Sequence, residues 1–373
     1  MGKTITFLLM YYDPEFPTVN LIYQSHIDQC LAQGMSVNII TPNPTRGVSR
    51  EVQKAYKKRK YEQLSENCHL YRVSAFTYRR FHKFHLLLRY LSVSYRCARK
   101  LKKVNSDIVF LQTSPPIFYA YFASKVAKKR GMKIYYDVQD IYPDNIFKKG
   151  TLIYRVVNRL QKKILQRADI ISTISRDMVE TLKAKGDFAA KIQVNPNPAT
   201  YPIAVYDGKK LAQVKEKFNF NDAQKTILYA GNIGYLQDID LFLAAAKLLI
   251  SRSDLVFKIV GEGSQAQRIK ARIAEENLTN CEFYPMTSNE ESAYLYKLAD
   301  LNYIALLPGV IYTACPLKTA MIVQAGKPTI AAVDADSLYL EDLKAHGFPV
   351  LVVPNRDYHL LKTKIEEFFP MQK

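Results

Sequence analysis

Two glycine-rich turns in the second half of the chain each follow an apolar run, at residues 231–234 and 261–263. Glycine lets the backbone approach a phosphate closely, and a helix that begins after such a turn directs its positive end at the same anion. The two turns together predict a site for a nucleotide diphosphate, whereas either turn alone is also typical of a tight strand–helix connection. The candidate contacts are Gly231, Asn232, Gly234, Gly261, Glu262 and Gly263.

Pro316 and Lys318 stand at the start of a further predicted helix, which ends before Gly326. A lysine in the first turn of such a helix can neutralise a pyrophosphate as a point charge. The competing interpretation of Lys318 is a solvated surface lysine. We therefore add Pro316 and Lys318 to the predicted phosphate site.

Asp13, Gln139 and Asp140 are the polar candidates in the first half of the chain. A carboxylate can take a proton from a hydroxyl group and so act as a general base. Asp140 is our candidate for this base or for an acceptor contact. An aspartate shortly before Pro143 is, however, also typical of a turn or a helix cap.

Positive charge is concentrated in the first half of the chain. Residues 1–200 hold 34 Lys and Arg against 14 Asp and Glu, which leaves 19 against 20 for residues 201–373 and a total of +19. Basic residues mixed with leucines and aromatics favour an amphipathic helix at an anionic membrane surface, with a solvated basic face as the alternative. We expect no nucleic-acid partner, because no recognised nucleic-acid module is visible. The predicted membrane or acceptor residues are Arg79, Arg80, Lys83, Arg89, Arg96, Arg99 and Lys100.

The elements that must position these residues alternate between strand and helix patterns, which predicts α/β architecture with two doubly wound, Rossmann-like parallel sheets facing a central cleft. We expect a basic, membrane-facing domain at 1–197, a linker at 198–222, a nucleotide-binding domain at 223–355 and a C-terminal helix at 356–373 that packs back on the first domain. The five cysteines are widely spaced without a CxxC pair, which predicts reduced thiols and no zinc site.

Residues 229–246, 260–263 and 316–328 together resemble family 4 glycosyltransferases of the GT-B fold. Residues 111–146 resemble bacterial members that build capsule, O-antigen or exopolysaccharide on a polyprenyl diphosphate carrier. The resemblance implies retaining transfer of a hexosyl or N-acetylhexosaminyl group from a nucleotide sugar, UDP-linked in our interpretation, to a lipid-linked saccharide. It also implies that Gln237 lies near the donor, that no metal or other cofactor takes part, and that the protein is cytoplasmic and peripheral on the inner face of the cell membrane, as a homodimer or beside a partner transferase.

Three positions depart from the family pattern. Thr313 and Met321 stand where relatives commonly carry two glutamates, and Gln139 stands where many carry histidine. A methionine cannot accept hydrogen bonds from ribose hydroxyls as a glutamate does. Two alternatives therefore stay open: a non-catalytic or weakly active partner subunit of a glycosyltransferase complex, and a nucleotide-sugar epimerase.

Overall fold

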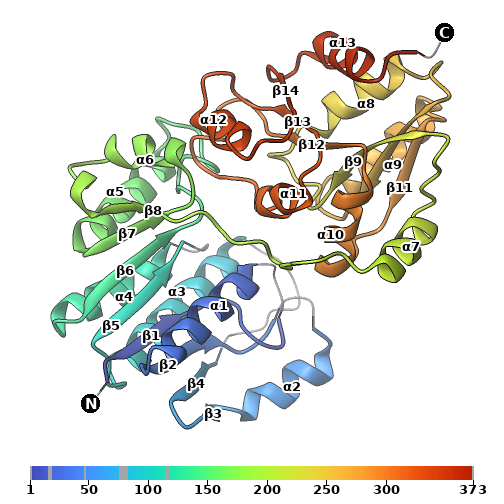
Figure 1. Cartoon of the computed structure of the whole chain (residues 1–373). Coiled ribbons are helices and arrows are strands. Elements are labelled where there is room, and N and C mark those ends of the chain that lie inside the picture. Colours follow the sequence, from blue (N-terminus) through green and yellow to red (C-terminus); the bar gives the residue numbers. More distant parts are fainter. Residues whose placement is uncertain (1, 16–18, 46–47, 75–82, 114–116, 372–373) are drawn as a thin grey trace. The chain divides into compact units, whose positions relative to one another are not determined.

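The computed structural model describes residues 2–15, 19–45, 48–74, 83–113 and 117–371, and the side chains at 19 and 83–86 are also outside this description. The chain forms two compact units, residues 1–196 and 197–373, coloured blue to green and yellow-green to red in Figure 1. Each unit is a sheet covered by helices. We describe them separately below.

The first unit contains an eight-stranded sheet of order β3-β4-β2-β1-β5-β6-β7-β8. All neighbouring strands are parallel except β3 and β4, which form an antiparallel hairpin. The central strands are almost continuously apolar and buried, as expected for parallel strands covered on both faces. Its elements are β1 (Thr4–Leu8), α1 (Val19–Ala32), β2 (Ser36–Pro42), α2 (Arg50–Lys58), β3 (Tyr61–Ser65), β4 (Cys68–Val73), α3 (Lys83–Leu101), β5 (Ile108–Gln112), α4 (Phe118–Lys129), β6 (Lys133–Val138), α5 (Leu152–Arg167), β7 (Ile170–Thr173), α6 (Arg176–Lys183), the 3-10 turn η1 (Ala189–Lys191) and β8 (Ile192–Val194).

The second unit contains a six-stranded parallel sheet of order β11-β10-β9-β12-β13-β14. One apolar core lies on each face of this sheet. The strand order reverses between β9 and β12, and ligands of open α/β sheets bind at such a reversal, beyond the carboxyl ends of the strands. Its elements are α7 (Gly208–Lys217), β9 (Lys225–Ala230), α8 (Ile239–Leu248), β10 (Leu255–Val260), α9 (Ala266–Glu275), β11 (Cys281–Tyr284), α10 (Asn289–Leu298), β12 (Leu301–Ala305), α11 (Thr319–Ala325), β13 (Thr329–Ala332), α12 (Leu338–Lys344), β14 (Val350–Val353) and α13 (Tyr358–Phe368).

The predicted pair of doubly wound parallel sheets is confirmed, and a helix lies near each end of the second unit's sequence. The predicted linker at 198–222 contains helix α7, whose Val214 and the following Phe218 are buried in the second unit's core. Helix α13 buries Leu361 and Ile365 in the second unit's core against α8 and β14. Apolar residues four apart share one helix face, and this face already has a partner in its own unit.

Candidate functional site

The two glycine turns lie against each other at the carboxyl ends of neighbouring strands β9 and β10. The N–H of Gly231 donates to the Val260 carbonyl (2.9 Å), and the N–H of Ile233 donates to the Glu262 carbonyl (2.8 Å). A Cβ on Gly261 would lie 2.0 Å from the Gly231 carbonyl oxygen, and one on Gly263 would lie 2.3 Å from that of Ile233. These turns therefore require glycine because the two backbones touch.

Gln237 closes the first turn. Its Oε1 accepts the N–H of Gly234 (3.1 Å). The Gln237 side chain, which we expect near the donor, therefore holds the first glycine turn in place. A Cβ on Gly234 would lie 2.8 Å from the Asn232 side chain. Asn232 and Glu262 are exposed. Because the N–H groups of Gly231, Gly234 and Gly261 all donate within the unit, these glycines shape the site rather than supply its hydrogen bonds.

Lys318 brings a buried positive charge to this loop. Its Nζ is buried without a hydrogen-bond partner among the described residues and lies 3.5 Å from the centroid of the Tyr229 ring. A Cβ on Gly231 would lie 3.4 Å from the same nitrogen. Burial lowers the pKa of Lys318 to about 7. An unpaired buried ammonium is costly, and the aromatic ring offsets only part of that cost, so an anion bound beside Nζ would lower it.

Residues around Lys318 fix its position. Thr319 Oγ1 donates to the Pro316 carbonyl (2.7 Å) and lies 2.9 Å from the Tyr339 hydroxyl oxygen. The N–H of Thr319 donates to the same Pro316 carbonyl (3.0 Å). The Pro316 carbonyl thus helps to position Lys318, because it accepts both hydrogen bonds of the turn from which Lys318 extends.

The positions that depart from the family pattern are structural in this chain. Met321 is 3% exposed within an apolar core, and Thr313 is buried with its hydroxyl donating to the Val310 carbonyl (3.0 Å). Neither side chain supplies a carboxylate to a nucleotide. Ribose hydroxyls must therefore find other acceptors if the unit binds a nucleotide.

In the first unit, Asp137, Gln139 and Asp140 follow one another at the end of β6. Asp137 Oδ2 accepts the Tyr23 hydroxyl (3.1 Å) and Gln139 Nε2 (2.8 Å), so the predicted Gln139 is held by a carboxylate. The backbone N–H groups of Gln139 and Asp140 both donate to Thr113 Oγ1 (2.8 and 3.2 Å). These contacts give the end of β6 a defined geometry.

Burial raises the pKa of both Asp137 and Asp140 to about 6. A carboxyl group with a pKa in this range takes up a proton more readily near neutral pH than an ordinary aspartate does. Sequence reasoning missed Asp137, although a lone acidic residue inside the apolar strand KIYYDV was a signal that could have found it.

Asp13 is anchored elsewhere in the unit. Its Oδ2 accepts the Tyr56 hydroxyl (3.1 Å) and lies 3.8 Å from Arg72 Nη2, whose side chain is almost fully buried. Arg72 also donates through Nε to Glu62 (3.0 Å). These contacts give Asp13 a role in holding its loop, and they involve neither Gln139 nor Asp140.

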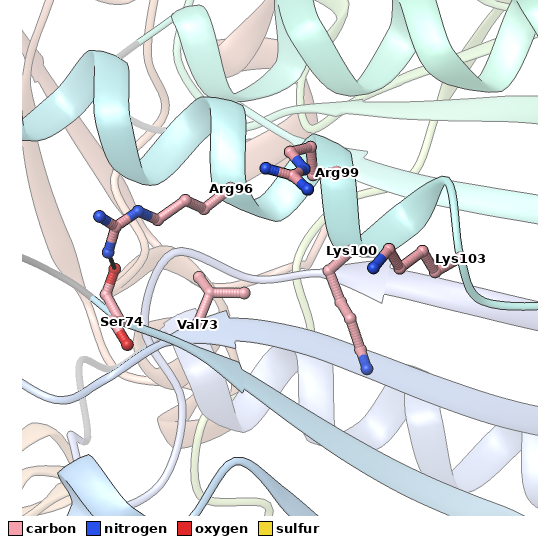
Figure 2. A pocket seen from close by; sticks show the side chains of 6 residues that line it. All are labelled: Val73, Ser74, Arg96, Arg99, Lys100 and Lys103. Atoms are coloured by element: carbon pink, nitrogen blue, oxygen red, sulfur yellow. Dashed lines mark hydrogen bonds between the residues drawn. The ribbon is translucent and has the colours of Figure 1, made fainter.

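Part of the predicted basic surface gathers at the carboxyl-terminal half of α3. Arg96, Arg99 and Lys100 line a hollow of about 270 Å³, joined there by Lys103 and by the end of β4 (Figure 2). Arg96 Nη1 donates to the Ser74 carbonyl (3.0 Å). Arg89 lies apart from the hollow and donates to Thr45 Oγ1. Outside the described residues lie Arg79, Arg80 and the side chain of Lys83.

Two features are absent from the described part of the chain. No group of three or more His, Cys, Asp or Glu side chains there is arranged to hold a metal ion. No helix among these residues has the length and apolar character needed to cross a bilayer.

Two curated relatives come from bacteria. The chain is 27% identical over 231 residues to WcaI of Escherichia coli K12, named for colanic acid biosynthesis as a glycosyl transferase, which covers 59% of this chain and 56% of WcaI. It is 23% identical over 237 residues to WbjE of Pseudomonas aeruginosa, named as a glycosyltransferase, which covers 61% of this chain and 58% of WbjE. The chain thus spans little more than half the length of each relative.

Solved structures share the fold at low sequence identity. Sucrose-phosphate synthase of Thermosynechococcus elongatus matches with a TM-score of 0.71 at 14% identity, over 98% of this chain and 89% of the other. WaaG, a glycosyltransferase of lipopolysaccharide biosynthesis, gives 0.66 at 15% identity, over 97% and 90%. HepE of Anabaena with UDP-glucose gives 0.66 at 12% identity, over 98% and 90%. These structures establish the GT-B fold.

Models of two protein families match consecutive parts of the chain. Glycosyltransferase Family 4 matches residues 25–199, and Glycosyl transferases group 1 matches residues 212–372. The first match falls mainly on the unit that carries Asp140, and the second lies within the unit that carries the glycine turns and Lys318. The chain therefore belongs to the glycosyltransferases that join a Family 4 domain to a group 1 domain on the GT-B fold.

Proposed function

We propose that this protein transfers a sugar, with retention, from a UDP-linked donor to a saccharide on a polyprenyl diphosphate carrier during synthesis of a bacterial surface polysaccharide. The observation that carries the proposal is the unpaired, buried Nζ of Lys318 beside the glycine turns. The donor diphosphate supplies the missing anion there, and Lys318 then stabilises the negative charge of the departing UDP. Family membership and the names of WcaI and WbjE support this reaction class.

UDP is our choice of nucleotide because HepE, which shares the fold, was solved with UDP and with UDP-glucose. In our proposal no metal takes part, so the fixed cation Lys318 carries the charge stabilisation. Asp140 is the acceptor contact or base, because its raised pKa suits proton uptake near neutral pH. The hollow lined by Arg96, Arg99 and Lys100 binds the anionic acceptor or the membrane on which it resides.

The test is a transfer assay with UDP-sugars and a polyprenyl-diphosphate-linked saccharide, followed by assignment of the anomeric product. Wild-type protein should transfer one sugar in the presence of a chelator. Asp140→Asn should lose transfer and keep UDP binding, whereas Asp187→Asn, at an exposed position, should change neither. Donor conversion without an acceptor would identify an epimerase instead.

A second function is favoured by Met321 and Thr313, which remove two carboxylates that relatives carry. In this case the protein is a partner subunit that stabilises an active transferase. It would bind that transferase without binding any nucleotide. A thermal-shift screen against UDP, GDP, CMP and their sugar conjugates separates the two, because a ligand of the folded state raises apparent stability by mass action.

A further inference from the structure

The first two turns of α5 expose apolar side chains that a folded surface ordinarily buries. Leu152 is 77% exposed, Ile153 51% and Val156 50%, and Ile146 in the preceding turn is 55% exposed. We refer to these four residues as the α5 patch. A cluster of large exposed apolar residues of this kind marks an interaction site.

The α5 patch cannot serve the core of its own unit. Helix α5 buries the opposite face through Gln161, Ile164 and Leu165 and packs beside α4 (Figure 1). Leu152 and Val156 are four residues apart and lie on the outward face. The helix thus already has its partner within the first unit, and the patch is left without one among the described residues of that unit.

The first turn of α5 is held firmly in this position. Thr151 Oγ1 accepts the N–H of Tyr154 (3.3 Å), and the Tyr154 hydroxyl donates to Asp144 Oδ1 (2.9 Å). Asp144 also forms an ion pair with Lys185, and both side chains are nearly buried. These contacts fix the first turn of α5, in which Leu152 and Ile153 are exposed.

Basic residues surround and continue the patch. No acidic residue occurs between Asp144 and Asp169, and the same segment contains seven Lys and Arg. Apart from Arg167, which bonds to Tyr121 and Ser124, they form no hydrogen bond or ion pair through their side chains with other described residues. They are Lys148, Lys149, Arg155, Arg159, Lys162, Lys163 and Arg167.

The sheet topology fixes which edge of the unit carries the patch. In a crossover between parallel strands, the helix begins near the carboxyl ends of the strands. Helices α3 and α5 both precede strands of this sheet and flank α4, so their first turns share that edge. Leu87 and Leu88 near the start of α3 are also exposed (44% and 42%), and Asp140 lies at the same edge.

We propose that the α5 patch inserts into an anionic lipid bilayer, with the surrounding Lys and Arg on the lipid phosphates. Exposed apolar side chains ringed by uncompensated positive charge are the chemistry that an anionic bilayer surface accepts. This inference deepens the proposed peripheral membrane binding. It places the edge that holds Asp140 against the membrane, where a lipid-linked acceptor is available. The hollow beside α3 then remains for the anionic acceptor.

A tryptophan reporter tests insertion directly, because the chain contains no tryptophan. Leu152→Trp, excited selectively over tyrosine, should shift its emission to shorter wavelength with phosphatidylcholine–phosphatidylglycerol vesicles, and brominated lipids should quench it. Val205→Trp, at an 85% exposed position in the other unit, should show neither effect. An unshifted Leu152→Trp, or an equal shift in both variants, overturns the inference.

Paired charge variants test the basic rim. Arg155→Gln with Arg159→Gln should lower the partition coefficient on anionic vesicles by about 25-fold, since each basic residue near such a surface contributes about fivefold. Lys128→Gln with Lys129→Gln removes the same charge from the carboxyl-terminal end of α4, at the opposite edge, and should change binding little. Equal losses in both pairs, or equal binding to pure phosphatidylcholine, contradict the inference. Vesicle binding needs no donor or acceptor, so these outcomes are independent of the transfer assay.

Discussion

Replacing Lys318 by methionine should make the ligand-free protein more stable and at the same time weaken nucleotide binding. The pKa of Lys318 falls from 10.5 to about 7 on burial, a difference of about 3.5 pH units. At 1.36 kcal/mol per unit, the buried amine costs up to about 5 kcal/mol of folding free energy. Methionine fills similar space without that cost, so the gain approaches this value if the site does not rearrange.

The sign of the pH dependence follows from proton binding. Between about pH 7 and 10.5 the unfolded chain keeps the Lys318 proton and the folded chain releases it. The cost is therefore complete below about pH 7 and declines as pH rises through this interval. Denaturant unfolding of wild type and Lys318→Met should show the largest difference in free energy of unfolding at low pH, shrinking by about 1.4 kcal/mol per pH unit above pH 7.

Nucleotide binding should respond in the opposite way. A bound diphosphate favours the charged amine, so wild type should take up about one proton on binding UDP at about pH 8, and its affinity should fall by up to tenfold per pH unit above that. Loss of a hydrogen bond to a charged group should raise the Kd of Lys318→Met by about 10- to 100-fold. Calorimetry in buffers of different ionisation enthalpy measures both quantities.

The control for both measurements is Lys344→Met, which removes an exposed lysine from α12. This variant should match wild type in stability and in UDP affinity. The reasoning is refuted if Lys318→Met is less stable than wild type at every pH, or if it binds UDP as wild type does.

Three further predictions concern stability. Gly261→Ala should destabilise the second unit by several kcal/mol, because its Cβ would lie 2.0 Å from a carbonyl oxygen. Gly208→Ala, at the open start of α7, should be neutral or stabilising by up to about 1 kcal/mol. Thermal unfolding distinguishes the two variants. Asp144→Ala should lower the free energy of unfolding by about 3 to 5 kcal/mol, because it leaves Lys185 buried without its anion. Glu180→Ala breaks an exposed ion pair with Lys183 and should lower it by less than about 1 kcal/mol. Similar denaturation midpoints for the two variants would disprove this. Burial raises the pKa of Asp137 and of Asp140 from 3.8 to about 6, so the folded chain binds more protons in that interval, and each carboxyl should lower wild-type stability by up to about 3 kcal/mol as pH rises through it. Unfolding of Asp137→Asn across the same interval should lose the share of Asp137 and keep that of Asp140.

Both sheets of the fold could be predicted from the sequence because strands buried on two faces read as short apolar runs such as residues 108–112 and 255–260. The hairpin of β3 and β4 was missed, since β3 (YEQLS) is largely exposed and polar and carries no such signal. Helix α7 was taken for linker because the prolines before it end any regular pattern, although Val214 and Phe218 do pack in the core.

The candidate site was predictable in composition but not in geometry. Glycine spacing indicated the two turns, yet only the structure shows that Gly261 is required by its distance to Gly231. Likewise, the local sequence at residues 316–319 does not show whether the Lys318 side chain is buried or exposed, because its burial depends on Tyr229, which is distant in the sequence. The exposure of Leu152 was unpredictable for the same reason, since an apolar residue in a helix normally indicates a buried face.

The interlocked turns have a consequence for changing donor preference. The N–H groups of Gly231 and Gly261 donate to the Val260 and Tyr284 carbonyls of the neighbouring strands, and that of Gly234 donates to Gln237, so this backbone is fixed before any ligand arrives. In the proposed function it would contact only what all nucleotide sugars share. Discrimination among bases and sugars must then come from side chains that project from this frame, such as the exposed Asn232 and Tyr235. Directed evolution of a new donor should accordingly randomise those projecting side chains and leave the glycines fixed.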